Sequence, residues 1–307
     1  MTIVFGPVPS RRLGRSLGID LVPFKTCTYD CIYCQLGRTT NETDERRAWV
    51  DIDRITRELE DKLETAPDYI TLGGSGEPTL HSGIGELIAR IKDISDIPIA
   101  VLTNGSLLWR DDVREELSGA SLVIPSLDAG DQETFEAVNR PIASISYREM
   151  VEGIASFTHA YTGECLLEVF IVEGVNSRME DAKKIADAVK SIRPAGVQLN
   201  TVSRPPAEPW AVRTSMDRLE DIARLFDPPA EVIADHPPAD DSGEHAASEE
   251  SIIELLRRRP CTIDDISRGL GIHMHEVIKH VNNLTRRGVV HTMKRGDVIY
   301  YGIAQDA

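Results

Sequence analysis

Short apolar runs alternate with amphipathic stretches from Leu17 to Ser203. The apolar runs predict strands at 17–24, 68–74, 97–105, 121–129, 165–174 and 196–203. Between them, apolar residues at helical spacing predict helices at 51–66, 84–94, 110–119, 146–161 and 178–192. Continuously apolar strands joined by helices are typical of a parallel sheet with crossover helices. We therefore expect an α/β fold, a partial (β/α)6 TIM-like barrel, with functional residues at the carboxyl ends of its strands.

The pattern changes after Pro205, where proline, acidic and small residues predominate up to Ala247. This composition predicts a linker that carries one short helix around 215–226. Beyond it the pattern predicts helices at 248–259, 262–271 and 273–288, and then two strands around a turn at 294–297. This order resembles a winged helix-turn-helix. The predicted domains are a core at 1–205, a linker at 206–247 and a winged helix-turn-helix at 248–307.

The composition adds three limits. No run approaches 18 apolar residues, so we expect no membrane-spanning helix and no membrane partner. The N-terminus places apolar residues before charged ones, the reverse of a secretory signal, and we expect a cytoplasmic protein. A net charge of −16 disfavours nucleic-acid binding through the overall field, although it leaves room for a local basic patch.

The cysteines are the first chemical signal. Three of the five, Cys27, Cys31 and Cys34, lie in "KTCTYDCIYCQLGRT". A structural zinc site usually takes four ligands, and a redox CxxC pair leaves Cys27 unexplained. An iron–sulfur cube accounts for the group best, because three thiolates leave one iron open. Zinc and a structural or redox role stay open at this point.

The motif Cys27-x3-Cys31-x2-Cys34, with Tyr33 before the last cysteine, resembles the signature of the radical S-adenosylmethionine (SAM) superfamily. The resemblance implies a [4Fe–4S] cluster on the three cysteines, whose open iron is chelated by the amino and carboxylate groups of SAM. It also implies reductive cleavage of SAM to a 5′-deoxyadenosyl radical that abstracts hydrogen from a substrate. Tyr33 would then flank the adenine.

Three later motifs fit the same resemblance. In "TLGGSGEPTL", residues 71–80, the backbone of Gly74 and Gly76 and the Glu77 carboxylate are expected to contact the SAM amino group. Asn104 is expected either to face the cofactor or to cap its turn. Ser126 and Asp128 alternate onto one face and are expected to bind the ribose, although Asp128 is also placed to cap the next helix.

Within the superfamily, "GPVPSRRLGRSLGIDLVPFKTCTYDCIYCQLG" most resembles a group of Fe–S oxidoreductases related to the wyosine-type tRNA synthases and the molybdenum- and nitrogenase-cofactor synthases. No cysteine precedes Cys27, and Cys165 and Cys261 stand alone, so a second cluster is not expected and neither reaction is carried over. The resemblance implies a one-electron donor such as ferredoxin or flavodoxin. The substrate is unknown: a tRNA base, a peptide or a cofactor precursor.

Two further sets of residues are placed to meet a substrate. Arg11, Arg12 and Arg15 are expected to grip a phosphate or carboxylate, or else to pair with acids of the chain. Asn200 and Arg204 end the sixth strand, where barrel geometry points toward the substrate.

The C-terminal residues 248–307 hold nine Lys and Arg against eight Asp and Glu, in contrast to the acidic remainder. This asymmetry fits a nucleic-acid contact through the winged helix. A protein contact or self-association, and a passive structural lid, stay open as alternatives. A rival interpretation is a non-catalytic iron–sulfur redox sensor that binds DNA. The glycine–glutamate motif and the Ser126/Asp128 pair argue against it, since a sensor needs no nucleotide site.

Overall fold

The computed structural model describes residues 2–10, 12–234, 249–296 and 298–304. Its main sheet has the order β1-β2-β5-β6-β7-β8-β9-β10, in which β1 is antiparallel to β2 and the other neighbours are parallel. The strands of this sheet are β1 (Val4–Ser10), β2 (Gly14–Ile19), β5 (Tyr69–Leu72), β6 (Ile99–Thr103), β7 (Leu122–Pro125), β8 (Glu164–Ile171), β9 (Gly196–Thr201) and β10 (Glu231–Val232). A small parallel pair, β3 (Thr26–Cys27) and β4 (Asn41–Glu42), lies apart from it.

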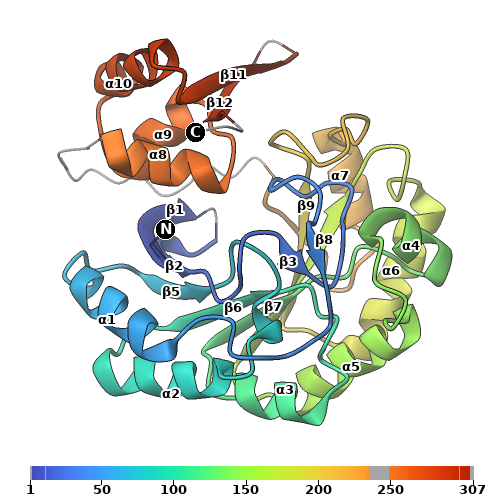
Figure 1. The fold of residues 1–307 in the computed structure, drawn as a ribbon. Coiled ribbons are helices and arrows are strands. Elements are labelled where there is room, and N and C mark those ends of the chain that lie inside the picture. The colour runs from blue at the N-terminus through green and yellow to red at the C-terminus, as the bar shows by residue number, and fades with distance from the viewer. Residues whose placement is uncertain (1, 11, 235–248, 297, 305–307) are drawn as a thin grey trace.

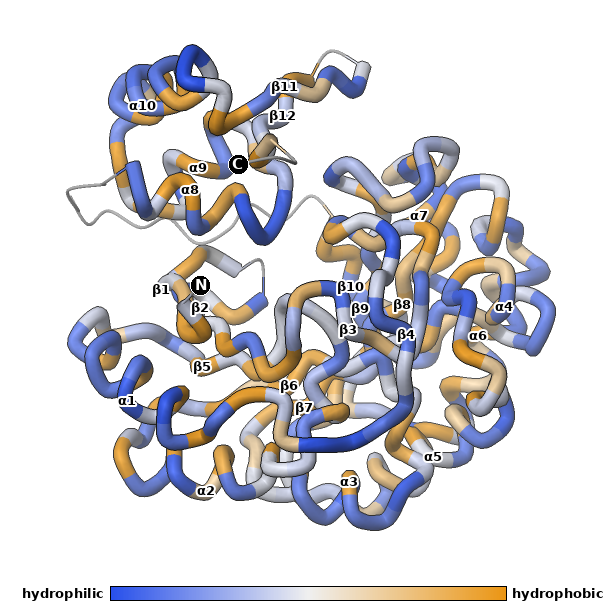
Figure 2. Tube along the Cα trace, viewed as in Figure 1, coloured by the Kyte–Doolittle hydropathy of each residue, from blue (hydrophilic) through white to orange (hydrophobic). Residues whose placement is uncertain are grey.

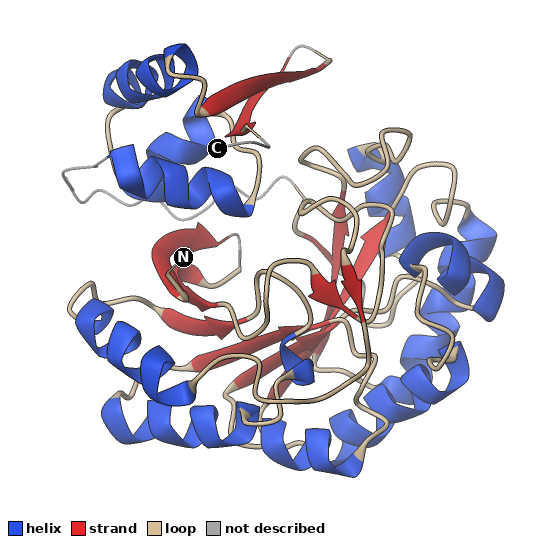
Figure 3. Ribbon diagram, viewed as in Figure 1, coloured by secondary structure: helices blue, strands red, loops and turns tan. Residues whose placement is uncertain are grey.

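Helices cover the outer face of this curved sheet (Figures 1 and 3). They are α1 (Ile52–Leu63), α2 (Ile84–Ile94), α3 (Asp111–Leu117), α4 (Gln132–Asn139), α5 (Tyr147–Ala160), α6 (Met179–Ile192) and α7 (Met216–Ala223). A short 3₁₀ helix, η1 (Pro78–Leu80), lies in the connection between β5 and α2. Each long helix buries an apolar stripe and exposes a polar one, which Figure 2 shows as alternating orange and blue along α1 and α2. Ile55 and Leu59 of α1, for example, are fully buried.

The predicted α/β fold with a mostly parallel sheet is confirmed, and the six predicted strands correspond to β2 and β5 to β9. The structure adds β1, which pairs antiparallel with β2 at the edge of the sheet. Sequence reasoning placed these residues before the first strand. Pro7 and Pro9 interrupt the apolar alternation of β1, and proline is tolerated in a strand mainly at a sheet edge.

The expected linker also differs from the structure over part of its length. Leu219 and Ile222 of α7 are fully buried in the main hydrophobic core, and β10 extends the sheet next to β9. Residues 216–234 therefore pack with the core. The boundary at 205/206 stays a prediction, and the boundary at 247/248 lies outside the described residues.

The C-terminal residues form a separate hydrophobic cluster around Ile252, Val277 and Leu284. Their elements are α8 (Glu249–Arg258), α9 (Ile263–Leu270), α10 (Met274–Arg286), β11 (Val290–Arg295) and β12 (Val298–Ile303), with the last two paired as an antiparallel hairpin. Thr262 caps α9 through a reciprocal capping box with Asp265, as its sequence position predicts. We call residues 249–304 the C-terminal unit.

Arg258 anchors the C-terminal unit to the barrel. Its Nη2 donates to the Asp20 carboxylate and the Thr2 carbonyl, both at 3.1 Å, and its guanidinium stacks 3.8 Å from the centre of the Phe5 ring. Both Arg258 and Asp20 are buried. Burial raises the pKa of Asp20, while the charge of Arg258 opposes that shift. A buried charge left without its partner is costly, so this pair fixes where α8 lies.

Among the described residues, no helix is both long and apolar enough to cross a membrane.

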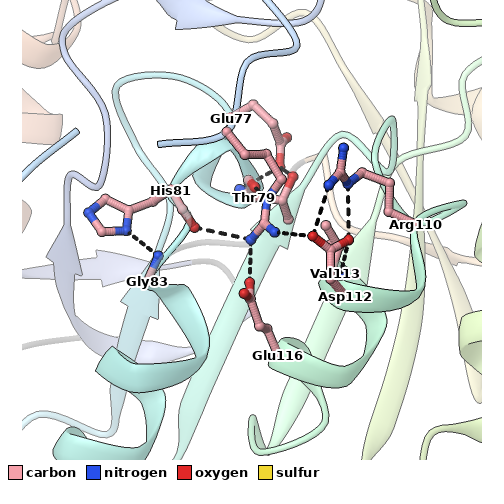
Figure 4. Close-up of polar contacts among 9 residues, drawn as sticks. Glu77, Thr79, His81, Gly83, Arg110, Asp112, Val113 and Glu116 are labelled. Atoms are coloured by element: carbon pink, nitrogen blue, oxygen red, sulfur yellow. Dashed lines mark hydrogen bonds and ion pairs between the residues drawn. The ribbon is translucent and has the colours of Figure 1, made fainter. Parts of the chain in front are cut away.

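His81 connects the segment after the cysteines to the start of α2. Figure 4 shows its ring beside Gly83. The Gly83 N–H donates to Nδ1 at 3.0 Å, and Nε2 lies 2.8 Å from the Val50 carbonyl oxygen. Both contacts are satisfied together only by a neutral ring that carries its proton on Nε2. Burial correspondingly lowers the pKa of His81 below 6.5.

We expect the stabilising effect of His81 to depend on pH. The unfolded chain takes up the proton more readily than the folded one, so the contribution is complete above pH 6.5 and declines as the pH falls below it. His81→Gln is expected to lower the free energy of unfolding by about 1–3 kcal/mol at pH 8. The difference from wild type should shrink toward pH 5.5 in urea titrations. The exposed His159→Gln is the control, and a difference that stays constant across this range would contradict the assignment.

Candidate functional site

A cavity of about 480 Å³ opens at the carboxyl ends of the parallel strands. Seven of the ten residues predicted from the sequence line it: Tyr33, the glycines 74 and 76, Ser126 and the three cysteines 27, 31 and 34. The other three, Glu77, Asn104 and Asp128, lie behind its wall. The site therefore lies at the carboxyl ends of the strands, as expected for a barrel, but only the structure shows which side chains face it.

The cysteine loop is held in place by its backbone. Ile32 N donates to the Val138 carbonyl, and Asp30 N donates to the Asn139 carbonyl, which fastens the loop to the end of α4. The buried Asp30 carboxylate pairs with Arg38 at 2.6 Å and accepts from Thr39 N at 2.8 Å. Cys34 N donates to the Cys31 carbonyl. Held in this way, the loop places all three cysteines in the lining of the cavity.

The surroundings of the three thiols fit an iron–sulfur cluster. Burial raises the pKa of all three, that of Cys27 to about 12, and a coordinated metal would favour their thiolate form. Side-chain amides approach two of the sulfurs: Asn104 Nδ2 lies 3.5 Å from Cys27 Sγ, and Asn139 Nδ2 lies 3.5 Å from Cys31 Sγ. Hydrogen bonds to the sulfurs of such clusters tune their potential.

The three sulfurs face one cavity without converging on a point. In the described ranges, no three His, Cys, Asp or Glu side chains come together as a single-ion site. A cube presents its irons at separate corners, so it accepts ligands spaced in this way.

The glycine-rich loop runs directly against the cysteine loop. Lys25 N donates to the Ser75 carbonyl at 2.7 Å, and Glu77 N donates to the Thr26 carbonyl at 3.1 Å. At Gly74 a φ of +139° excludes most side chains. A Cβ at Gly76 would lie 2.9 Å from the Thr26 carbonyl carbon and closer still to its oxygen. Glycine at these positions lets the two loops meet and leaves their backbone facing the cavity.

Glu77 is buried behind that loop. Its Oε1 accepts from Thr79 N at 3.0 Å and from the hydroxyls of Thr79 and Thr103, both at 2.6 Å, and its Oε2 accepts from Asn104 N at 2.7 Å. Burial raises its pKa, and these hydrogen bonds oppose the shift. Figure 4 shows Glu77 turned toward Thr79. The carboxylate thus ties β5 to β6, and its contact with the SAM amino group stays a prediction.

Asn104 caps its turn, and its contact with the cofactor stays a prediction. Its Oδ1 accepts from Ser106 N at 2.9 Å, which caps the turn, and its Nδ2 donates to Thr28 Oγ1 at 2.7 Å. The bond to Thr28 and the contact of Nδ2 with Cys27 Sγ both support the cysteine loop from the side away from the cavity.

Asp128 also acts on protein groups. Its Oδ2 accepts from the Tyr33 hydroxyl at 2.5 Å and from Asn139 Nδ2 at 2.7 Å, and its Oδ1 accepts from Phe170 N at 2.8 Å. Burial raises its pKa to about 6, while these donors oppose the shift. The Tyr33 ring stacks on Phe170 with centroids 3.9 Å apart. Asp128 therefore orients Tyr33 at the cavity, and its contact with the ribose stays a prediction.

Glu168 and Phe170 on β8 also line the cavity, although the sequence analysis did not single them out. Glu168 accepts from Arg12 at 2.8 Å and from Asn200 Nδ2 at 2.9 Å. The residues of β8 at positions 165, 167, 169 and 171 are buried and those between them are partly exposed, so alternation along "ECLLEVFI" was the available signal.

The arginines expected to meet a substrate separate in the structure. Arg12 lines the cavity and pairs with Glu168, in line with the expected pairing with acids. Arg15 lines a second, smaller cavity, while Arg11 lies outside the described residues. Asn200 and Arg204 both line the main cavity.

With the fold and the cavity defined, the class of the protein follows from comparison. Residues 21–198 match the model of the radical SAM superfamily, a range that contains the ten residues predicted to bind the cluster and SAM. The chain belongs to the radical SAM superfamily. Membership of this superfamily confirms the two predicted cofactors, SAM and a [4Fe–4S] cluster.

Among its relatives is a UPF0026 protein of Helicobacter pylori strain J99, which is 32% identical over 98% of this chain and 97% of the relative. A Brachyspira hyodysenteriae protein described as "GTPase Obg" is 38% identical over 98% of this chain, but the chain spans only 45% of that protein's length. The Helicobacter pylori protein therefore matches this chain over nearly the whole length of both.

Solved structures show the same fold. A radical SAM methyltransferase from Sphaerobacter thermophilus superposes with a TM-score of 0.53 at 17% identity, over 71% of this chain and 65% of that one. Streptococcus suis SuiB bound to S-adenosylmethionine gives 0.50 at 16% identity, over 68% of this chain and 45% of that one. At such identities the likeness concerns the fold alone.

Proposed function

We propose that this protein is a radical SAM enzyme that binds one [4Fe–4S] cluster through Cys27, Cys31 and Cys34 and abstracts hydrogen from a substrate. The observation that carries the proposal is that the three thiols and the backbone of the glycine loop open onto the same cavity. When bound, the cluster and SAM supply a one-electron reductive cleavage of the sulfonium and thereby a 5′-deoxyadenosyl radical.

The chain's own residues bind and orient the cofactors. The backbone of Gly74 and Gly76 would bind the amino group of SAM, Ser126 the ribose and Tyr33 the adenine. All four residues line the cavity, and the Tyr33 ring is fixed by Phe170 and Asp128. Asn104 and Asn139 hold the cysteine loop through their sulfur contacts. Such preorganisation is the protein's usual share of cofactor chemistry.

The finer assignments belong to the same proposal. The enzyme would be an Fe–S oxidoreductase related to the wyosine-type tRNA synthases and the molybdenum- and nitrogenase-cofactor synthases. Its electron donor would be ferredoxin or flavodoxin, and its location cytoplasmic. Its substrate would be a tRNA base, a peptide or a cofactor precursor. The C-terminal unit would be a winged helix-turn-helix that contacts nucleic acid or protein. Its three helices followed by a hairpin support that assignment.

The direct test is SAM turnover. Anaerobically reconstituted protein, incubated with dithionite and SAM, is expected to release 5′-deoxyadenosine and methionine, measured by liquid chromatography and mass spectrometry. A cluster visible by absorbance without any 5′-deoxyadenosine would overturn the proposal. Tight binding to DNA in that same preparation would favour the redox sensor, which has no use for a nucleotide-sized cavity.

A further inference from the structure

The main cavity extends beyond the barrel. Besides the cofactor-facing residues, its lining includes Arg204 after β9 and Arg259 and Asp265 of the C-terminal unit. Arg204 Nη2 lies 3.5 Å from Asp265 Oδ1, and the Tyr300 hydroxyl donates to the Ser203 carbonyl at 2.9 Å. The C-terminal unit therefore forms one wall of the cavity that contains the cysteines.

Apart from its three cysteines, the lining of this cavity carries more cations than carboxylates, in contrast to the chain as a whole. Among the described residues it holds four cations, Arg12, Lys25, Arg204 and Arg259, against two carboxylates, Glu168 and Asp265. The chain carries a net charge of −16. A concave site of one sign attracts ligands of the other sign.

The two carboxylates are each engaged by a cation of the cavity. Arg12 pairs with Glu168 at 2.8 Å, and Arg204 pairs with Asp265 at 3.5 Å. Within the described part of the chain, neither the Lys25 ammonium nor the Arg259 guanidinium pairs with a carboxylate. Lys25 lies 5.3 Å from the Phe24 ring and interacts with Cys34, and Arg259 contacts the Cys261 side chain. Two positive charges of the cavity are therefore left for a ligand.

Arg259 is directed to the cavity by its neighbour. Successive residues at a helix end point about 100° apart. Arg258 is buried between α8 and the barrel, with Asp20, Thr2 and Phe5 as partners. Arg259 N still donates to the Leu255 carbonyl, and Pro260 then ends the helix. Docking of Arg258 thus places Arg259 over the cavity rather than in solvent.

We propose that the substrate carries a phosphate or carboxylate group that the Arg259 guanidinium binds, so that the substrate lies between the barrel and the C-terminal unit. This rests on the proposed function, because it names the substrate class of that site. A guanidinium matches the two oxygens of either anion with paired N–H donors. Lys25 lies beside the cysteines and interacts with Cys34, whereas Arg259 belongs to the wall of the cavity that the C-terminal unit supplies.

The experiment is equilibrium dialysis of the full reconstituted chain against [³²P]phosphate, with and without saturating SAM and with no reductant. We expect saturable binding that acetate weakens by competition and that persists with SAM. Arg259→Gln is expected to weaken it at least about tenfold, the effect of 1.4 kcal/mol. Arg259→Lys keeps the charge but loses the paired donors. Its affinity for phosphate should lie between those of the wild type and Arg259→Gln.

Arg257→Gln is the matched control, because Arg257 lies on the same turn but is exposed. This variant protein should bind phosphate as tightly as the wild type. Equal unfolding midpoints for the two glutamine variants would exclude misfolding. Absence of saturable binding, equal binding by Arg259→Gln, or displacement by SAM would each overturn the proposal. Because the dialysis needs no radical chemistry, it can fail while SAM cleavage succeeds, and the reverse.

Discussion

Replacement of Cys31 by alanine is expected to abolish cleavage of SAM and to strip the reconstituted protein of most of its iron. Cys31 lies between the other two cysteines in the loop, and its sulfur contacts Asn139. Two remaining thiolates would have to hold a cluster that needs three. Mutation of a residue that only supports a metal ligand typically lowers activity roughly 10–100-fold. Because Cys31 is itself a ligand in this proposal, its removal should lower SAM cleavage by more than that. The measurements are iron and sulfide content, visible absorbance and 5′-deoxyadenosine formation.

Cys165→Ala is the matched control. Cys165 is 4% exposed in the main hydrophobic core and does not line the cavity. We expect wild-type iron content and SAM cleavage from it, with at most a lower unfolding midpoint from the small cavity left behind. Wild-type iron in Cys31→Ala, or in the corresponding Cys27 and Cys34 variants, would disprove the cluster assignment.

Gly76→Ala is expected to separate SAM cleavage from cluster binding. The new Cβ would collide with the Thr26 carbonyl, which is backbone and which accepts the Glu77 N–H. Relief of that clash must push the glycine loop away from the cysteine loop. A displacement of about 1 Å at a reacting centre costs about 100-fold in rate. We therefore expect 5′-deoxyadenosine formation to fall about that much, while much of the iron is retained because all three cysteines remain.

Gly196→Ala provides the comparison. At the start of β9, its added Cβ would meet only the end of the Leu166 side chain, at 3.2 Å, and it lies at the strand end opposite the cavity. This variant should cleave SAM like the wild type. The yield of 5′-deoxyadenosine and the affinity for SAM, measured by dialysis, are compared between the two variants. If Gly76→Ala matched Gly196→Ala in both, the close approach of the glycine loop to the cysteine loop would have no role in the site.

The location of the site could be predicted from the sequence because it depends on local order. Cys27, Cys31 and Cys34 are spaced within one loop, and the glycine motif follows the next strand. Carboxyl ends of parallel strands meet at one edge whatever the details of packing. The edge strand β1 could not be found in this way, because its prolines hide the alternation, and β10 is only two residues long.

The orientation of the polar side chains could not be read from the sequence. Ser126 and Asp128 were assigned to one face by alternation, but β7 ends at Pro125, so the rule no longer applies beyond it. Asp128 is buried against Tyr33 and Asn139, and Glu77 against Thr79 and Thr103. A buried carboxylate must find donors, and those it found come from other elements of the chain.

By itself, then, the sequence determined the parallel α/β core, the three-cysteine loop and the order of the strand-end motifs, because short-range periodicity and spacing encode all of these. Only the tertiary structure decided that Glu168 and Phe170 face the cavity, that Glu77, Asn104 and Asp128 support it from behind, and that Arg259 closes it from more than 200 residues beyond the cysteines. Such contacts depend on how distant elements pack, which no local pattern records.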